Sequence, residues 1–286
     1  MRKDKWEYGI PAGILKVDRP LIMGILNVTP DSFSDGGQFY RAEDAYRHAQ
    51  GMVQAGADII DVGAESTRPG AEVVDTKEEW RRLEAVLRKL RSEISIPISI
   101  DTFKSEIAQR ALDSGVDIIN DISGLTFDSQ MVRVASRAAC PVIIMHIRGT
   151  PRDMQQNLHY DNLMEELHQF FQRQVEFAED HGISQLILDP GIGFGKRLHD
   201  NLEIIRRLSE FRGFGFPLLV GPSRKSFIGR ILDADPEHRL MGTAATGCLA
   251  LNNGAQILRV HDVAEMKQLS SMVNAVNFND FLELSD

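Results

Sequence analysis

The sequence predicts an α/β fold of one domain, a single (β/α)8 barrel that begins with an N-terminal β-hairpin and has long loops after its first and second strands. Three observations predict this fold. Eight short apolar runs alternate with segments of helical period, no change in composition divides the chain, and polar residues gather where the runs end. Such alternation is typical of a parallel sheet covered by helices, and eight units close a TIM barrel. We expect one domain over 1–286, with the hairpin in 1–19 and the barrel in 21–279.

The hairpin and the strands follow from the order of apolar and turn residues. Pro11 and Gly13 supply a turn within residues 7–19, so a hairpin is expected there, acting as a lid or a plug. Each later apolar run is too short for a helix and reads as a strand that is buried on both faces. The runs are 21–27, 57–62, 96–101, 116–121, 142–146, 185–189, 217–221 and 255–261.

The segments between the runs have the spacing of amphipathic helices. One of them opens with the capping pattern Asp75-x-x-Glu78. Apolar stripes run along two segments, with Trp80, Leu83, Leu87 and Leu90 in one and Leu163, Leu167, Phe170, Phe171 and Phe177 in the other. Glycine favours the left-handed end of a helix, and four glycines stand at such ends: Gly56, Gly115, Gly182 and Gly254.

Composition excludes several classes of function. The net charge of −9 argues against binding to nucleic acid or to an anionic membrane, because both depend on positive charge. No segment has the run of about 20 apolar residues that a membrane span needs, so we expect a cytoplasmic protein. Cys140 and Cys248 both lie among apolar residues, which favours small buried thiols over a disulfide or a metal site.

Polar residues stand where the apolar runs end. Chemistry in a barrel of this kind lies at the carboxyl ends of the strands, where the following loops meet. The residues in or just after these ends are Asn27, Asp61, Asp101, Asn120, Asp121, His146, Asp189, Ser223 to Ser226, Arg259 and His261. Two of the following loops, 29–37 and 65–70, are long and rich in turn residues, which makes them candidate lids.

One half of this rim is suited to a flat heterocycle. Asp101, Asn120 and Asp189 offer acceptors and one amide, and Lys225 offers three donors. An aminopyrimidinone, with N–H groups on one edge and a carbonyl or ring nitrogen on another, would satisfy them. Asp189 could equally cap the next helix or pair with a neighbouring cation. The glycines that follow it, Gly191, Gly193 and Gly195, fit neither a dinucleotide fingerprint nor a P-loop.

The other half of the rim is suited to an anion. Asn27, Arg68, Arg259 and His261 come from the first, second and eighth strands or their loops. Asn27 is neutral and could bind Mg²⁺, which commonly joins a few protein oxygens to substrate phosphates.

Three rim residues have other expected roles. Asp61 and Asp121 are expected to hold loops by hydrogen bonds, whereas His146 fits a structural or a catalytic role equally well.

Eight segments of the chain resemble, in order, the motifs of the dihydropteroate synthase family. They are 23–37, 59–70, 98–102, 120–121, 145–151, 188–196, 223–226 and 259–262. The resemblance covers essentially the whole chain. Two apolar positions depart from the usual pattern: Ala64 stands where the family usually has a second glycine, and Ile147 where methionine or glutamine is frequent.

The resemblance implies a transferase of folate biosynthesis. It would condense 6-hydroxymethyl-7,8-dihydropterin diphosphate with 4-aminobenzoate, giving 7,8-dihydropteroate and pyrophosphate by an SN1-like reaction, and it would be a sulfonamide target. Both substrates are small molecules, and Mg²⁺ is the implied cofactor. The family also implies a homodimer through the outer helices near the seventh and eighth units. A pterin-dependent methyltransferase and a non-catalytic paralogue remain as alternatives.

Roles for individual residues come from the resemblance as well. The pterin would be bound by Asp101, Asn120, Asp189 and Lys225, with Arg259 against its ring. The diphosphate would be held by Asn27, Arg68, Arg259 and His261, with Mg²⁺ on Asn27. The aminobenzoate would be bordered by Thr67, Ser226, Phe33, Pro69, Phe194 and Lys225. Further substrate contacts would come from Gly221 and Met145, and the catalytic residues would be Lys225, Arg68, Asp35, Arg259 and His261.

Overall fold

Eight parallel strands form the centre of the molecule, as the sequence predicts. The structure is a computed structural model that describes residues 5–29, 38–66, 70–71, 73–156 and 158–278. The strands are β3 (Leu21–Asn27), β4 (Ile59–Gly63), β5 (Ile98–Asp101), β6 (Ile118–Asp121), β7 (Val142–Met145), β8 (Leu186–Asp189), β9 (Leu219–Val220) and β10 (Ile257–Val260). Most strands begin one or two residues after the predicted run, while their ends agree to within one residue.

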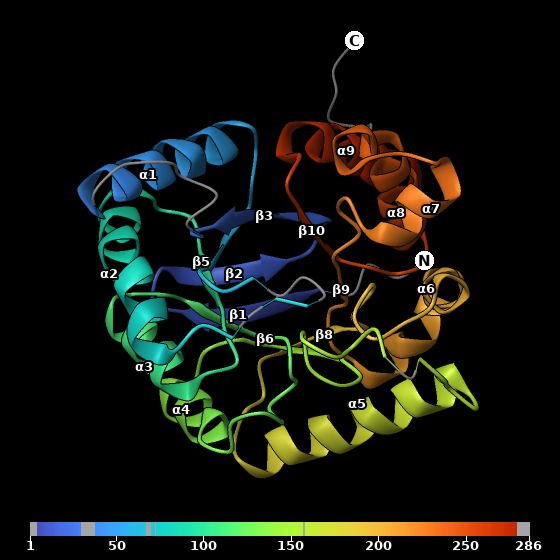
Figure 1. The fold of residues 1–286 in the computed structure, drawn as a ribbon, viewed down its shortest axis with the longest axis horizontal. Coiled ribbons are helices and arrows are strands. Elements are labelled where there is room, and N and C mark those ends of the chain that lie inside the picture. Colours follow the sequence, from blue (N-terminus) through green and yellow to red (C-terminus); the bar gives the residue numbers. More distant parts are fainter. Residues whose placement is uncertain (1–4, 30–37, 67–69, 72, 157, 279–286) are drawn as a thin grey trace.

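The sheet closes into a barrel surrounded by helices. Neighbouring strands follow the order β8-β7-β6-β5-β4-β3-β10-β9, and a parallel bridge between Leu188 and Leu218 joins the two outer strands. Figure 1 shows the helices as an outer ring around the strands. This arrangement confirms the (β/α)8 barrel, and it brings the carboxyl ends of all eight strands to one rim.

The helices alternate with the strands except in the seventh unit, which has two. They are α1 (Gln38–Gln54), α2 (Thr76–Glu93), α3 (Ser105–Asp113), α4 (Met131–Ala138), α5 (Leu163–Asp180), α6 (Leu198–Arg207), α7 (Ser226–Leu232), α8 (Leu240–Asn252) and α9 (Val263–Phe278). Both α7 and α8 lie between β9 and β10, so the described chain has one helix more than the sequence pattern indicates. None of the helices in the described ranges could cross a membrane.

The predicted helix ends are largely confirmed. Asp75 caps α2 by accepting a hydrogen bond from the peptide N–H of Glu78 at 2.9 Å, whereas the Glu78 side chain binds Arg81 and Arg82 instead of closing a capping box. The four glycines expected to end helices all have φ between 80° and 109°. One residue of the predicted apolar stripes is not buried in the core: Phe177 on α5 is 37% exposed.

The N-terminal hairpin is a plug at the amino end of the barrel. Its strands are β1 (Trp6–Ile10) and β2 (Gly13–Val17). Tyr8, Leu15 and Val17 pack against apolar residues that the barrel strands point inward. The Tyr8 hydroxyl donates to the carbonyl oxygen of Leu186 at 2.6 Å, inside the barrel. The plug therefore lies opposite the rim and leaves that rim to substrates.

Helices α7, α8 and α9 lie side by side at one corner of the molecule and expose apolar side chains (Figure 1). Helix α8 has no charged residue, so it lacks the polar outer face of a helix that meets water. The thiol of Cys140 is buried as predicted, but the prediction for Cys248 is wrong, because this residue of α8 is exposed. Its apolar neighbours indicated burial, and they are themselves part of an exposed helix.

We expect Tyr8→Phe to lower the free energy of unfolding by about 1–2 kcal/mol, because the Leu186 carbonyl loses a buried donor. Urea denaturation measures this loss. Catalytic activity should not change, since the plug lies at the other end of the barrel. The control Glu7→Gln, which removes an ion pair between two exposed side chains, should leave stability unchanged. Equal stability of Tyr8→Phe and the wild type would contradict the role of this hydroxyl.

Candidate active site

Strand register places the predicted pterin residues side by side on the rim. Asp101 at the end of β5 pairs in register with Asn120 on β6, and Met145 at the end of β7 pairs with Asp189 at the end of β8. All four side chains are largely buried, with exposed fractions of 3–9%. The barrel thus gathers two carboxylates and an amide over an apolar wall that includes Met145.

Arg259 connects three strands across the mouth of the barrel. Its Nε donates to Asp61 Oδ2 at 2.6 Å, and its Nη2 donates to Asp101 Oδ2 at 2.6 Å. Asn120 Nδ2 donates to the same Asp61 oxygen at 3.1 Å. Asp61 is fully buried, so its carboxylate acts here as the anchor that orients Arg259 and Asn120. This agrees with the hydrogen-bonding role predicted for Asp61.

Two opposing effects set the protonation state of Asp101. Burial raises the pKa of this carboxyl group to about 7, although the guanidinium of Arg259 opposes that rise. A carboxylate in this position gains from any further N–H donor. The wall around Asp101 can therefore discriminate in favour of a ligand whose edge carries N–H groups.

Asp121, the neighbour of Asn120, has a structural role in the turn after β6. Its carboxylate accepts hydrogen bonds from the peptide N–H of Ser123 at 2.8 Å, from the Ser123 hydroxyl at 2.7 Å and from the peptide N–H of Leu125 at 2.9 Å. These contacts hold the turn after β6. The structure thus agrees with the loop-holding role predicted for Asp121.

Asp189 and Lys225 form the second polar pair of the rim. Asp189 accepts a hydrogen bond from the peptide N–H of Gly191 at 2.7 Å, and burial raises the pKa of its carboxyl group. The pKa of Lys225 is lowered to about 8 by burial and by the positive charge of Arg259. The Lys225 ammonium lies 4.1 Å from the centre of the Phe194 ring, a cation–π contact.

The glycines after β8 are explained by close approach. A Cβ atom on Gly191, which has φ of 69°, would lie 1.9 Å from the carbonyl oxygen of His146. A Cβ on Gly193, with φ of 86°, would lie 2.9 Å from Cδ of Lys225. Only glycine fits such positions. The turn therefore lets the chain pass close to the β7 loop and lets Lys225 lie along it.

His146 and Lys196 form a buried pair beneath this turn. Lys196 Nζ lies 3.0 Å from Nδ1 of His146, and burial lowers the pKa of His146 well below its ordinary value. The neutral ring packs edge-on against Phe170. The structure thus favours the structural role for His146. Lys196 was missed by the sequence reasoning, although a lysine directly after the spaced glycines was the available signal.

The other side of the rim holds the predicted anion residues that the structure describes. Ser223 Oγ lies 2.9 Å from His261 Nδ1 and accepts a hydrogen bond from the His261 peptide N–H. Asn27 ends β3, next to β10, and its side chain makes no hydrogen bond within the described ranges. Ser226 is exposed at the start of α7, and Gly221 is half-buried just after β9.

Five predicted site residues lie outside the described residues: Phe33, Asp35, Thr67, Arg68 and Pro69. The described ends of the loop that contains the last three are anchored by Lys104. Its Nζ lies 2.5 Å from Glu65 Oε2, 2.6 Å from the carbonyl oxygen of Val74 and 2.5 Å from Glu79 Oε2. The second long loop therefore begins and ends on the β5 side of the rim, next to Asp101.

Comparison with known proteins identifies the class of enzyme. Residues 23–261 match the family described as pterin binding enzyme. Together with the fold, this match defines a pterin-binding enzyme built on a TIM barrel.

Individual relatives are more specific. The dihydropteroate synthase of Synechocystis sp. is 52% identical over 90% of each chain. A Yersinia pestis dihydropteroate synthase structure with a sulfonamide drug complex is 42% identical, with a TM-score of 0.89 over 95% of this chain and 99% of that chain. A Clostridium difficile dihydropteroate synthase structure in the presence of pteroic acid is 45% identical, with a TM-score of 0.87 over the same shares. The chain belongs to the dihydropteroate synthase family, as its motifs imply.

We expect Arg259→Met to lower the free energy of unfolding by about 3–5 kcal/mol at neutral pH, because Asp61 and Asp101 lose their buried cation. The loss should be smaller at about pH 5 than at about pH 8. A buried carboxyl group with a raised pKa favours the folded state when it is protonated, and this advantage disappears as the pH rises through that pKa. Denaturation at both values measures the difference.

The control for this variant is Arg224→Met. Arg224 pairs with Asp262 but is 40% exposed, so its loss should cost less than about 1 kcal/mol. Similar losses for the two variants would mean that the Arg259 ion pairs do not stabilise the rim.

Proposed function

We propose that the rim residues described above divide between the two substrates of the dihydropteroate synthase reaction. The enzyme is a transferase that condenses 6-hydroxymethyl-7,8-dihydropterin diphosphate with 4-aminobenzoate, releasing pyrophosphate and giving 7,8-dihydropteroate for folate biosynthesis. The observation that supports the residue assignment is the group formed by Asp101 and Asn120 on the neighbouring strands β5 and β6 and by Asp189 on β8, with Lys225 near enough to interact electrostatically with both carboxylates. Acceptors outnumber donors in this group, as a pterin edge with several N–H groups requires.

The pterin binds to Asp101, Asn120, Asp189 and Lys225, over Met145. Its N–H groups donate to the two carboxylates, and Lys225 donates to a ring nitrogen or carbonyl. Arg259 Nη2 donates a hydrogen bond to Asp101 Oδ2. A pterin N–H group takes over this position, and the guanidinium then turns toward the ring face and the diphosphate. Arg259 thus keeps the carboxylate paired until the substrate arrives.

The diphosphate binds at the Asn27 side of the rim, with Arg68, Arg259 and His261. Mg²⁺ is the proposed cofactor. The Asn27 amide oxygen, which is not engaged by another described residue, suits a hard cation. Within the described ranges no cluster of acids, histidines or cysteines forms a complete metal cage, so substrate oxygens would supply other ligands. A Mg²⁺ ion held by Asn27 would supply positive charge for the departing pyrophosphate.

The bond between the pterin methylene carbon and the diphosphate oxygen breaks first, in an SN1-like reaction. Arg68, Arg259 and His261 stabilise the charge that grows on the leaving group, while the ring donates electrons to the methylene cation. The lone pair of the neutral amine of 4-aminobenzoate then forms the new C–N bond, and the proton that the nitrogen loses passes to the released pyrophosphate or to solvent. Asp35, Arg68, Arg259, His261 and Lys225 are the proposed catalytic residues, and they act by charge and position.

The aminobenzoate lies between the pterin and the solvent. Phe194 and Lys225 form one wall, Ser226 at the start of α7 and Gly221 lie beside it, and Phe33, Thr67 and Pro69 complete the pocket. The cation–π contact between Lys225 and Phe194 supports the proposal that the Lys225 ammonium group serves both the heterocycle and the second substrate.

We expect Lys225→Met to reduce kcat/KM at least about tenfold, because charge-assisted hydrogen bonds contribute about 1.5–3 kcal/mol each. Its thermal stability should hardly change, since burial of the ammonium already opposes its charge. Pyrophosphate release, measured with both substrates and with each alone, tests the reaction itself. Lys89→Met on the outer surface of α2 should behave as the wild type. Wild-type turnover by Lys225→Met would exclude the assigned role.

We also propose that the protein is a homodimer through an apolar helix face formed by α7, α8 and α9. On α8, Met241, Ala245, Cys248 and Leu249 repeat at helical spacing and are exposed. Met272 and Val276 on α9 are 65% and 67% exposed. An uncharged helix beside such side chains is typical of a face that a second subunit covers.

The variant Met241→Glu/Leu249→Glu should therefore be monomeric, because two charges per subunit would be buried in the interface. Sedimentation velocity gives the mass of the species in solution. Phe177→Glu, which charges an exposed aromatic residue on α5, should stay dimeric. A wild-type protein with the mass of one chain would contradict the dimer.

A further inference from the structure

Lys196 uses all of its hydrogen-bonding capacity on neutral groups of two loops. Its side chain is buried, with 3% of the residue exposed. Nζ lies 3.0 Å from His146 Nδ1, 3.1 Å from the His146 carbonyl oxygen and 3.0 Å from the Phe194 carbonyl oxygen. An ammonium group has three N–H donors, so these three acceptors satisfy it completely. The contacts tie the loop after β7 to the turn after β8.

A neutral donor could make such contacts at a lower cost, because burying a charge among neutral acceptors is unfavourable. Hydrogen bonding alone therefore does not explain why a positively charged side chain is buried at position 196. Asp189 lies on the other side of Gly191, whose peptide N–H binds the Asp189 carboxylate at 2.7 Å. A Cβ atom on Gly191 would lie 3.3 Å from Lys196 Nζ. Asp189 and Lys196 thus bind the same turn, Asp189 through the peptide N–H of Gly191 and Lys196 through the carbonyl oxygen of Phe194.

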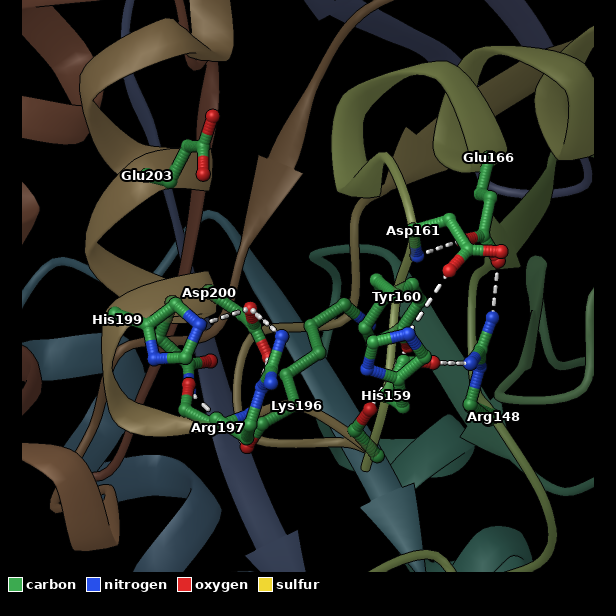
Figure 2. Close-up of polar contacts among 12 residues, drawn as sticks. Arg148, His159, Tyr160, Asp161, Glu166, Lys196, Arg197, His199, Asp200 and Glu203 are labelled. Atoms are coloured by element: carbon green, nitrogen blue, oxygen red, sulfur yellow. Dashed lines mark hydrogen bonds and ion pairs between the residues drawn. The ribbon is translucent and has the colours of Figure 1, made fainter. Parts of the chain in front are cut away.

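Tyr160 holds the next peptide group of the turn from outside. Its hydroxyl donates to the carbonyl oxygen of Gly195 at 2.8 Å. The Arg148 guanidinium lies 3.7 Å from the centre of the Tyr160 ring. Figure 2 shows Arg148 joined to Glu166 and to the carbonyl group of His159. Tyr160 therefore makes a second contact with the same turn through an uncharged group. Its removal tests the effect of geometry without changing the charge.

We propose that Lys196 is a positioning residue for pterin binding: its ammonium group fixes the turn after β8 and serves as the counter-charge that keeps Asp189 ionised. This inference rests on the proposed role of Asp189 as an acceptor for the pterin. As a carboxylate, Asp189 has two acceptor oxygens, one for the Gly191 peptide N–H and one for an N–H group of the substrate, whereas protonation turns one oxygen into a donor. Lys196 does not touch the substrate and acts through Asp189.

The electrostatics of the site support this arrangement. Burial raises the pKa of Asp189, and the positive charges of Lys225, Lys196 and Arg259 oppose that rise. Burial lowers the pKa of Lys196 to about 7, and the carboxylate of Asp189 opposes that change. The charged and titratable groups that face the pair are His146 and Arg148 after β7, Asp200 on α6, Lys225 before α7 and Arg259 on β10.

Four variants separate charge from hydrogen bonding. Lys196→Met removes both, Lys196→Gln keeps an N–H donor without charge, and Tyr160→Phe removes only the outer clamp. Lys267→Met is the control for loss of a lysine elsewhere in the barrel: the Lys267 side chain is 29% exposed and pairs with Asp58, which precedes β4 at the amino end of the barrel. The dissociation constant of 6-hydroxymethylpterin is measured by calorimetry from about pH 5 to about pH 7.5, beside thermal denaturation of each variant.

Affinity should fall in every protein as the pH drops, because Asp189 and also Asp101, whose pKa is about 7, take up protons; the contribution of Asp101 is common to all variants. In Lys196→Met and Lys196→Gln the midpoint of this fall should move upward by about one pH unit, since Asp189 loses a nearby positive charge. Affinity below the midpoint should drop about tenfold. Tyr160→Phe and Lys267→Met should keep the wild-type midpoint, whatever stability they lose.

Each other outcome overturns the proposal. If the midpoint of both Lys196 variants equals that of Lys267→Met, the charge does not act on Asp189. If Tyr160→Phe shifts the midpoint as far as Lys196→Met, the effect is geometric. If neither Lys196 variant folds while Lys267→Met does, Lys196 serves stability alone. A wild-type enzyme that binds no pterin, or releases no pyrophosphate with both substrates, refutes the proposed roles of the rim residues instead.

Discussion

The site depends on the balance of buried charge at the mouth of the barrel. Three carboxylates, on Asp61, Asp101 and Asp189, face three cations, on Arg259, Lys225 and Lys196. Each group is unfavourable when buried alone, and each is tolerable because the others surround it. Since a neutral pterin adds no charge, it can enter this balanced ring. The diphosphate brings negative charge, and it must bind where additional positive charge is available.

The buried charges of the rim lie apart from the elements that stabilise the barrel. The hairpin closes the amino end with Tyr8, Leu15 and Val17, which pack on the inward side chains of the strands. The helices cover the outside. The rim is therefore free to hold buried charged groups that are tolerated only while their partners are present. This division explains why apolar runs end abruptly in acids and amides at one edge only.

Backbone-level features were predictable from the sequence. Apolar runs gave the strands to within two residues, glycines marked helix ends, and strand ends gave the rim residues. Through-space relations were not predictable. The ion pairs of Arg259 connect residues 158 and 198 positions apart, and nothing in the local sequence selects them over other pairs. Cys248 was misjudged for a related reason, because apolar neighbours in the sequence do not tell which face of the helix a residue occupies.

The turn after β8 has one feature that the sequence predicts, its glycines, and one that it does not, the contacts around them. Its glycines were visible in the sequence, but their purpose depends on what approaches them: the carbonyl group of His146 at Gly191 and the stem of Lys225 at Gly193. A backbone without Cβ atoms can pass close to both Lys196 and Lys225. The side chains of Lys196 and Tyr160 satisfy the carbonyl groups of Phe194 and Gly195. The turn gains its rigidity from them, so Asp189 is held in place by residues that never meet the substrate.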